Sequence, residues 1–344
     1  MALSRTTETA PEVAGPGGGA PAPTAPFMVR RTRHIGALRW LSLLVRNRKA
    51  AIGLVILAFF LALAIVGPLI WSGDPNAADY SIPPTQPPSA AHPLGTDHLN
   101  HDIFLQMVDG AWPSLELGFA IGLCATALAV VIGMSAGYFG GWIDDILSLI
   151  INIVLIIPSL PLIIVLASWI RVRNDLPIIL VISLTGWAAG ARVLRSQTLS
   201  LRQKEFVQAA VVRGESGLRI VLREILPNMT SLVVSNFIGT TVFAIGSAAG
   251  LVFLGLGNIS EVSWFSILYQ AQNASALQDG AWWNFVPPGL AIALVGTALA
   301  LVNYGIDEIS NPRLRTERVK APRPASVPAS VPASAPAARK AAAR

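Results

Sequence analysis

The apolar residues of this chain gather in six long stretches that contain no charged side chain. These stretches are 50–73, 117–143, 146–170, 176–191, 225–260 and 280–306. A helix that crosses a bilayer needs about 20 predominantly apolar residues, and all but one of the stretches reach that length. The stretch 176–191 is shorter, so a helix that spans the bilayer must also include residues on either side of it. Arg192 would extend its charged end to the membrane interface. The pattern predicts an all-α membrane protein with six transmembrane helices.

One charged, amphipathic segment, 205–228, interrupts the apolar pattern. Residues 214–217 contain two glycines and predict a turn between two short helices. Ser200 and Gln203 have the spacing of a capping box at the start of the segment. An amphipathic helix of this kind is suited to bind in a groove of a soluble partner. The alternative is a helix that lies in the membrane interface without a partner.

The distribution of lysine and arginine sets the orientation, because cytoplasmic segments carry an excess of these residues. The segments 72–116 and 258–283 hold none, whereas 192–223 is rich in them. If both termini are cytoplasmic, Arg171 and Arg173 are the only ones of the 25 Lys and Arg residues that lie outside. The charged segment is then predicted to face the cytoplasm.

Composition divides the rest of the chain into regions. Residues 1–34 and 313–344 are of low complexity, and we expect both to be disordered cytoplasmic ends. Residues 35–73 hold the first predicted transmembrane helix, and 74–116 form an extracytoplasmic loop. Residues 117–312 form the helical core, which includes the charged segment.

Charge and composition exclude several functional classes. Charged residues make up 13% of the chain and apolar residues 53%, whereas a soluble globular protein carries about 25% charged residues. The net charge of +6 comes from basic residues in predicted cytoplasmic segments, and no basic groove with interleaved aromatic residues indicates nucleic-acid binding. Cys124 is the one cysteine, so it is expected to be a small packing residue.

The six apolar stretches contain no Asp, Glu, Lys, Arg or His. An intramembrane enzyme needs convergent nucleophiles, carboxylates or metal ligands, and a proton-coupled transporter usually needs an ionisable group inside a span. The sequence also lacks the G-x-x-x-x-G-K-[ST] phosphate loop. We therefore expect no catalysis and no bound ATP in this chain, and any energy must come from a partner.

The charged segment contains Gln208, Ala209, Ala210 and Gly214 in that order, followed by Ile-Leu-Pro at 225–227. This arrangement resembles the E-A-A-x3-G signature in the cytoplasmic coupling loop of ABC importer permeases. Gln208 stands where that family usually has Glu.

Four further segments resemble the dipeptide/oligopeptide/nickel class of these permeases, in its C-type subunit. They are HPLGTDHLNHDIF (92–104), GYFGGWID (137–144), FLGLG (253–257) and NPRLR (311–315). Asn100 and His101 stand where Gly-Arg is usual in the first of them. The resemblance covers about 92–315.

The resemblance implies a type I ABC importer permease fold with cytoplasmic coupling helices. It implies a coupling loop, 200–227, that contacts an ATPase. The residues expected at that contact are Glu205, Gln208, Ala209, Ala210, Arg213 and Gly214. Ala209 and Ala210 would permit close approach because they lack bulk.

The resemblance also implies partners and a location. These are a homologous second permease, two ATPase subunits that hold ATP and Mg²⁺, an extracytoplasmic substrate-binding protein, and the plasma membrane of a bacterium. The expected cargo is a di- or oligopeptide, with oligosaccharides or nickel as alternatives. A secondary transporter or channel is the alternative of a different class. The sequence does not identify the residues that line a path.

Two groups in the predicted outer loops have more than one interpretation. His92, His98 and His101, with Asp97 and Asp102 beside them, have the chemistry of metal ligands, but a solvated outer face explains them equally. A second group consists of Trp264, Trp282 and Trp283. These tryptophans are expected in the membrane-interface belt, or in contact with substrate or a docking protein.

Overall fold

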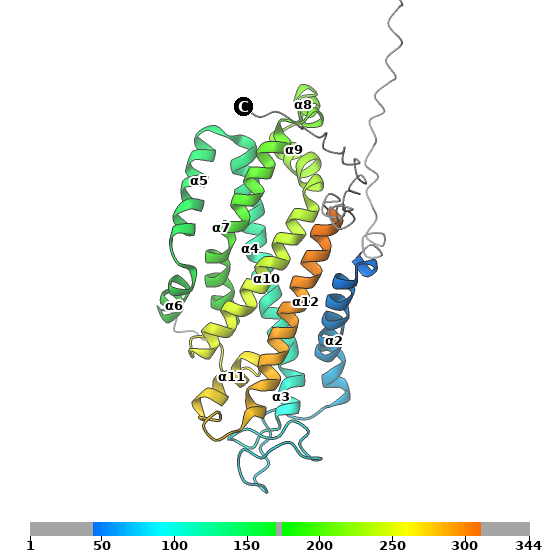
Figure 1. Ribbon diagram of the computed structural model, residues 1–344. Coiled ribbons are helices and arrows are strands. Elements are labelled where there is room, and N and C mark those ends of the chain that lie inside the picture. Colours follow the sequence, from blue (N-terminus) through cyan, green and yellow to red (C-terminus); the bar gives the residue numbers. More distant parts are fainter. Residues whose placement is uncertain (1–43, 170–173, 311–344) are drawn as a thin grey trace, which may run out of the picture.

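The computed structural model describes residues 44–169 and 174–310, which form a bundle of long helices with one loop-rich end (Figure 1). The helices in chain order are α2 (Arg48–Ile70), α3 (Ile103–Asp109), α4 (Ala111–Phe139), α5 (Gly141–Ile156), α6 (Ser159–Trp169), α7 (Asp175–Arg202), α8 (Glu205–Val212), α9 (Gly217–Ile220), α10 (Thr230–Phe253), α11 (Trp264–Asn273) and α12 (Val286–Ser310). The predicted disordered ends, 1–34 and 313–344, lie outside the described residues, as do Arg171 and Arg173.

Five helical segments of the described residues are long and apolar enough to cross a membrane, and the count is six if one bent pair forms a single span. The five are Arg48–Ile70, Ile103–Phe139, Asp175–Arg202, Thr230–Phe253 and Trp282–Ile309, and the pair is α5 with α6. The predicted all-α architecture is confirmed, with six apolar segments at the predicted places. α8 lies at one end of the bundle, and α11 and the loop before α3 lie at the other (Figure 1). We call these the α8 end and the α11 end.

The third predicted transmembrane helix is two helices, because α5 and α6 are bent by 89° at the break between them. Ile157 has extended backbone angles (φ −75°, ψ 126°) directly before Pro158. Proline disfavours the helical conformation in the residue before it and donates no backbone hydrogen bond. The helix therefore ends at Ile156, and the chain turns before α6 begins.

α7 is longer than the apolar stretch 176–191 from which it was predicted. The helix runs unbroken from Asp175 to Arg202, so the expected extension into the flanks is confirmed. Arg192 lies within this helical extension. It is an interior residue, almost three turns before Arg202, and its Nη2 donates a hydrogen bond to Asn152 Oδ1 of α5 (2.9 Å).

α4 lies against both α7 and α10, and small residues allow these helices to approach closely. A β-carbon on Gly133 of α4 would lie 2.4 Å from the carbonyl oxygen of Ala191. One on Gly122 would lie 2.1 Å from Thr241 Oγ1. Any larger side chain at either position would force the helices apart.

α2 packs along α12 at the edge of the bundle (Figure 1). Asn47 caps α2 through its side-chain oxygen, which accepts from the backbone N–H groups of Lys49 and Ala50. Its Nδ2 donates to Glu308 Oε2 of α12 (2.7 Å), so one residue both begins α2 and ties it to α12. The opposite face of α2 is apolar and exposed, which suits a helix at the periphery of a membrane bundle.

The loop before α3 folds into a compact structure at the α11 end. The buried carboxylate of Asp97 accepts from the backbone N–H groups of Leu99 and His101, and its Oδ2 lies 2.9 Å from His101 Nδ1. Trp283 Nε1 donates to the Thr96 carbonyl (3.1 Å), which joins this loop to the turn before α12.

Candidate functional site

The predicted helix–turn–helix segment is confirmed at the α8 end. α8 covers Glu205–Val212, and α9 begins at Gly217. The predicted capping box is wrong, because α7 continues through Ser200 and ends with Gln203 as its C-cap. Lys204 is the N-cap residue of α8, and no side chain caps that helix. A capping-box spacing inside the last turn of a preceding helix therefore gave a false start signal.

Gly214 ends α8 in the left-handed conformation, with φ of +76°. Its N–H donates to the Val211 carbonyl (2.9 Å), and the N–H of Glu215 donates to the Ala210 carbonyl (3.2 Å). These two bonds form a Schellman motif, which satisfies carbonyl groups at the end of the helix. A β-carbon at Gly214 would meet no atom within 4 Å, so the backbone conformation, not space, requires glycine there.

One face of α8 is buried against the rest of the chain. Val207 and Ala210 are fully buried, at 0% exposure each. They belong to a hydrophobic cluster with Ile220, Ile225 and Met229, directly before α10. Ala210 therefore packs inside this chain and does not lie on the surface.

The opposite face of α8 is exposed, and it carries Glu205, Gln208 and Ala209. Gln208 Nε2 donates to the Arg202 carbonyl (3.0 Å), which satisfies a carbonyl at the end of α7. Arg213 Nη2 lies 2.7 Å from Glu215 Oε1 and 3.7 Å from Glu224 Oε1. Arg213 is thus paired within the chain.

Exposed apolar side chains surround this polar face. Val212 is 88% exposed and Leu218 64%. We define the α8 surface as Phe206, Ala209, Val211, Val212, Leu218 and Leu222, all of them exposed. An apolar patch of this kind on a charged helical segment is typical of a protein-interaction site.

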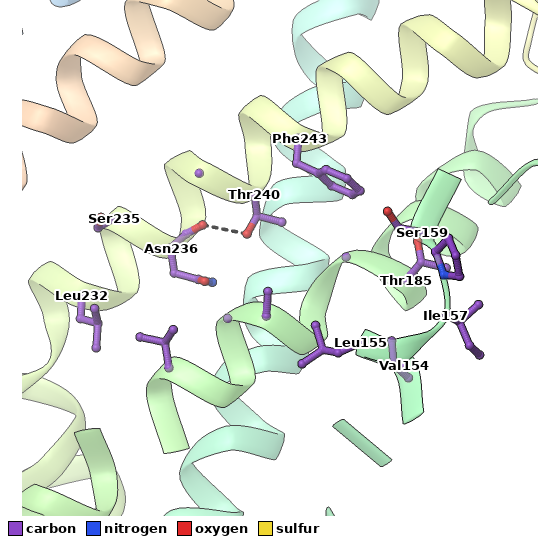
Figure 2. Close-up of a pocket in the computed structure, with 16 residues that line it drawn as sticks. Val154, Leu155, Ile157, Ser159, Thr185, Leu232, Ser235, Asn236, Thr240 and Phe243 are labelled. Atoms are coloured by element: carbon purple, nitrogen blue, oxygen red, sulfur yellow. Dashed lines mark hydrogen bonds between the residues drawn. The ribbon is translucent and has the colours of Figure 1, made fainter. Parts of the chain in front are cut away.

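A second candidate site is an open cavity of about 590 Å³ between α5, α7 and α10 (Figure 2). Its walls are the end of α5 with the break before α6, the central turns of α7, and α10. The bend at Pro158 opens this space, because a continuous helix would carry side chains through it. The cavity volume is in the range typical of small-ligand sites.

The cavity lining contains no charged residue. Its polar side chains are Ser159, Thr185, Ser235, Asn236 and Thr240, and the rest of the lining is apolar or glycine. Asn236 reaches from α10 toward α7 (Figure 2), where a β-carbon on Gly190 would lie 2.2 Å from Asn236 Oδ1. Asn236 Nδ2 donates to Thr126 Oγ1 of α4 (3.3 Å), so one amide joins three helices beside the cavity.

Thr185, Ser235 and Thr240 donate their hydroxyl protons within the bundle. Thr240 Oγ1 donates to the Asn236 carbonyl (2.8 Å; Figure 2). Ser235 Oγ donates to Asn303 Oδ1 of α12 (2.7 Å). The lining therefore offers mainly acceptor oxygens and apolar surface, which binds neutral groups without strong selectivity.

Two histidines of the loop before α3 lie beside carboxylates, and His92 Nε2 is also 3.9 Å from Asp79 Oδ2. His92 Nδ1 lies 2.9 Å from Asp102 Oδ2, and His101 Nδ1 lies the same distance from Asp97 Oδ2. Within residues 44–169 and 174–310, no group of three or more His, Cys, Asp or Glu side chains is arranged to hold a metal ion. The metal interpretation gains no support from this geometry.

The three tryptophans at the α11 end have different environments. Trp264 is 1% exposed, and its Nε1 donates to the Met107 carbonyl (3.0 Å), so its expected place in an interface belt is wrong. Trp283 braces the loop before α3, whereas Trp282 is 54% exposed.

Sequence reasoning missed the cavity and the pair of Arg192 and Asn152. Arg192 stands directly after an apolar stretch, so its charged end was expected to extend to the membrane interface and no partner was predicted for it. The pattern of α7 continues past it through Val193, Leu194 and Leu201, and this continuation was the available signal. The cavity had no local signal except Pro158.

The chain matches two family models. Residues 129–316 match the model described as binding-protein-dependent transport system inner membrane component. Residues 39–88 match the model described as N-terminal TM domain of oligopeptide transport permease C.

Curated relatives match most of the chain. A putative peptide transport system permease protein of Brucella suis is 31% identical over 275 residues, which cover 80% of this chain and 91% of the relative. A dipeptide transport system permease protein of Alkalihalophilus pseudofirmus is 33% identical over 277 residues, covering 79% and 88%. An oligopeptide transport system permease protein of Mycobacterium tuberculosis is 29% identical over 278 residues, covering 80% and 94%. Among solved structures, an inward-facing form of the MetNI methionine ABC transporter is similar with a TM-score of 0.48 and 19% identity, over 60% of this chain and 96% of that one.

Proposed function

The chain belongs to the family of binding-protein-dependent transport system inner membrane components, and we propose that it is the permease subunit of an ATP-driven importer of di- and oligopeptides. The relatives named as peptide, dipeptide and oligopeptide transport permeases support the cargo class. The observation that carries the proposal is the combination, in one membrane bundle, of an open cavity with an uncharged lining and an exposed apolar α8 surface. The first suits passage of a solute, and the second suits docking of a soluble subunit.

The proposed assembly contains this chain, a homologous second permease, two ATPase subunits and an extracytoplasmic binding protein. ATP and Mg²⁺ belong to the ATPases. The α8 end faces the cytoplasm of a bacterium, and the protein lies in the plasma membrane with both termini inside. The basic residues of 192–223 support this orientation, because they lie in α7 and the segment that follows it.

The α8 surface docks in a groove of an ATPase subunit. Glu205, Gln208 and Ala209 lie on the exposed face and are the residues within reach of that partner. Val207 and Ala210 pack α8 into the hydrophobic cluster that includes Met229, the residue before α10. A shift of α8 is passed through the buried residues of 217–229 to α10, which forms one wall of the cavity.

The cavity between α5, α7 and α10 forms this chain's share of the path. An uncharged lining lets peptide side chains of different kinds pass, because none of the lining residues is itself charged. ATP binding draws the two ATPases together, moves the α8 surfaces, and opens the path outward, and hydrolysis resets it.

The test is uptake of a labelled dipeptide by a reconstituted assembly of both permeases, the ATPases and the binding protein. We expect uptake that requires ATP and all four kinds of subunit. Uptake that proceeds without the ATPases would assign the chain to secondary transporters or channels. Uptake of an oligosaccharide or nickel, but not of peptides, would correct the cargo.

A further inference from the structure

Phe243 interrupts an exposed, glycine-rich face of α10. Positions 239, 243, 246 and 250 follow one another at the spacing that places residues on one face of a helix. Gly239, Gly246 and Gly250 are all exposed, and a β-carbon at any of the three would meet no atom of the described residues within 4 Å. Open space therefore follows this face of α10 on both sides of Phe243.

The cavity ends at Phe243 on the side of the α11 end. Its lining on α10 extends from Leu232 to Phe243, and its lining on α7 extends from Val193 back to Thr185. Ile182, one turn beyond Thr185 toward the α11 end, is 0% exposed. The walls of the cavity thus close at the level of the Phe243 ring.

The ring of Phe243 reaches from α10 to α7. A β-carbon on Gly186 of α7 would lie 3.2 Å from Phe243 Cε1 and 3.4 Å from its Cδ1, so the ring occupies the space that a side chain at this position would take. Figure 2 shows the ring pointing away from α10, toward the side where Thr185 and Ser159 lie. Phe243 therefore spans the gap between two walls of the cavity.

We propose that Phe243 is the constriction of the peptide path, and that its ring, packed over Gly186, separates the cavity from the open face of α10 at Gly246. The inference rests on the proposed function of peptide import, and it names the side chain that a passing peptide must displace. A narrow apolar constriction blocks polar solutes because water does not fill it. A shift of α10 away from α7 withdraws the ring and joins the two spaces.

The experiment compares two single cysteines on opposite sides of the ring, in a Cys124→Ala background. Gly239→Cys lies on the cavity side and Gly246→Cys on the side of the α11 end, and a β-carbon fits at both positions. Right-side-out membrane vesicles hold the complete assembly without ATP, and a small, charged, impermeant thiol reagent is added outside. We expect the Gly246→Cys variant to react. The Gly239→Cys variant should react only when the reagent also reaches the cytoplasmic side.

Substitution of the ring then tests the constriction itself. Phe243→Ala should raise the outside labelling rate of the Gly239→Cys variant at least about ten-fold, because the apolar barrier is removed. Phe243→Trp keeps an aromatic ring at this position and should leave that rate low. Phe237→Ala is the matched control on the same helix. The Phe237 ring stacks on Phe119 of α4, with centroids 6.1 Å apart, and is not part of the cavity lining.

Three outcomes overturn the inference alone. The first is an outside labelling rate of the Gly239→Cys variant that Phe243→Ala leaves unchanged. The second is an equal increase with Phe237→Ala, which would show a general loosening of the bundle. The third is no reaction of the Gly246→Cys variant from either side, which would place the glycine face against lipid or the second permease.

The labelling uses no peptide, so its result is separate from the uptake test of the proposed function. The expected labelling pattern, together with no peptide uptake by the wild-type assembly, would overturn the proposed cargo and support the constriction.

Discussion

Arg195 and Asp144 form a bidentate ion pair that joins the start of α5 to α7, with Nε–Oδ1 at 2.5 Å and Nη2–Oδ2 at 2.7 Å. Ser148, one turn along α5, donates to the same Asp144 oxygen (2.9 Å). α5 is one half of the broken span, and it forms part of the cavity wall. The pair therefore holds α5 in register with α7.

We expect Asp144→Asn to destabilise the purified permease by about 1–2 kcal/mol, because a charge-assisted contact is lost at a partly exposed site. Thermal unfolding in detergent measures the effect. A double-mutant cycle with Arg195→Gln should show that most of this free energy belongs to the pair. Additive effects of the two substitutions would contradict a direct interaction.

Gly214 provides a backbone test of the turn after α8. Its φ is +76°, a conformation that costs an L-residue with a side chain about 1–2 kcal/mol. Gly214→Val should therefore weaken ATPase association while the transmembrane helices still insert. Gly214→Asn is the matched control, since asparagine tolerates this conformation. Equal behaviour of the two variants would show that positive φ is not what the turn requires.

The orientation is tested by cysteine labelling in a Cys124→Ala background. Ser89 lies in the loop before α3, and Ser216 lies between α8 and α9, both exposed. Cysteine at Ser89 should react with an impermeant thiol reagent in intact cells. Cysteine at Ser216 should react only after the membrane is opened, and its labelling from outside would invert the topology.

Glu261 is expected to make the stability of the folded permease depend on pH. Burial, and then the nearby carboxylate of Asp175, raise the pKa of Glu261 above its ordinary value of 4.5. The folded state therefore binds this proton more tightly than the unfolded state does, and stability is lost as the pH rises from 4.5 through the raised pKa. Glu261→Gln should raise the melting temperature at neutral pH and remove that part of the pH dependence. A lower melting temperature at neutral pH would show that the charged carboxylate is stabilising.

The sequence predicted the features that depend on local composition. The six apolar segments, the helix–turn–helix at 205–228 and the turn at Gly214 follow from hydropathy, amphipathicity and glycine placement. The capping box predicted from Ser200 and Gln203 was wrong. The same residue spacing also occurs at the end of α7, which continues through Ser200.

The features that the sequence did not predict depend on contacts between distant residues. Ala209 and Ala210 are neighbours in the sequence, yet Ala209 is exposed and Ala210 is buried, because Ala210 faces the hydrophobic cluster that contains Ile220 and Ile225. Arg192 and Asn152 lie 40 positions apart, so their pairing required the antiparallel register of α5 and α7. The cavity likewise needs three helices and one bend to exist.

Because Ala209 is exposed and Ala210 is buried, substitutions at these two positions distinguish the docking of α8 from the stability of the permease. Ala210→Glu places a charge in a fully buried position, so we expect it to destabilise the permease itself by more than about 3 kcal/mol. Ala209→Glu changes an exposed position and should leave the melting temperature of the permease pair almost unchanged. Ala209→Ser adds little bulk and should keep full transport.

The decisive measurement is ATP-dependent dipeptide uptake by proteoliposomes that contain the complete assembly with Ala209→Glu. If the chain is a permease driven through the α8 surface, the variant should assemble with the second permease, lose the ATPase subunits on purification, and lose uptake at least about ten-fold. Wild-type uptake together with full retention of the ATPases in Ala209→Glu would contradict coupling through this surface.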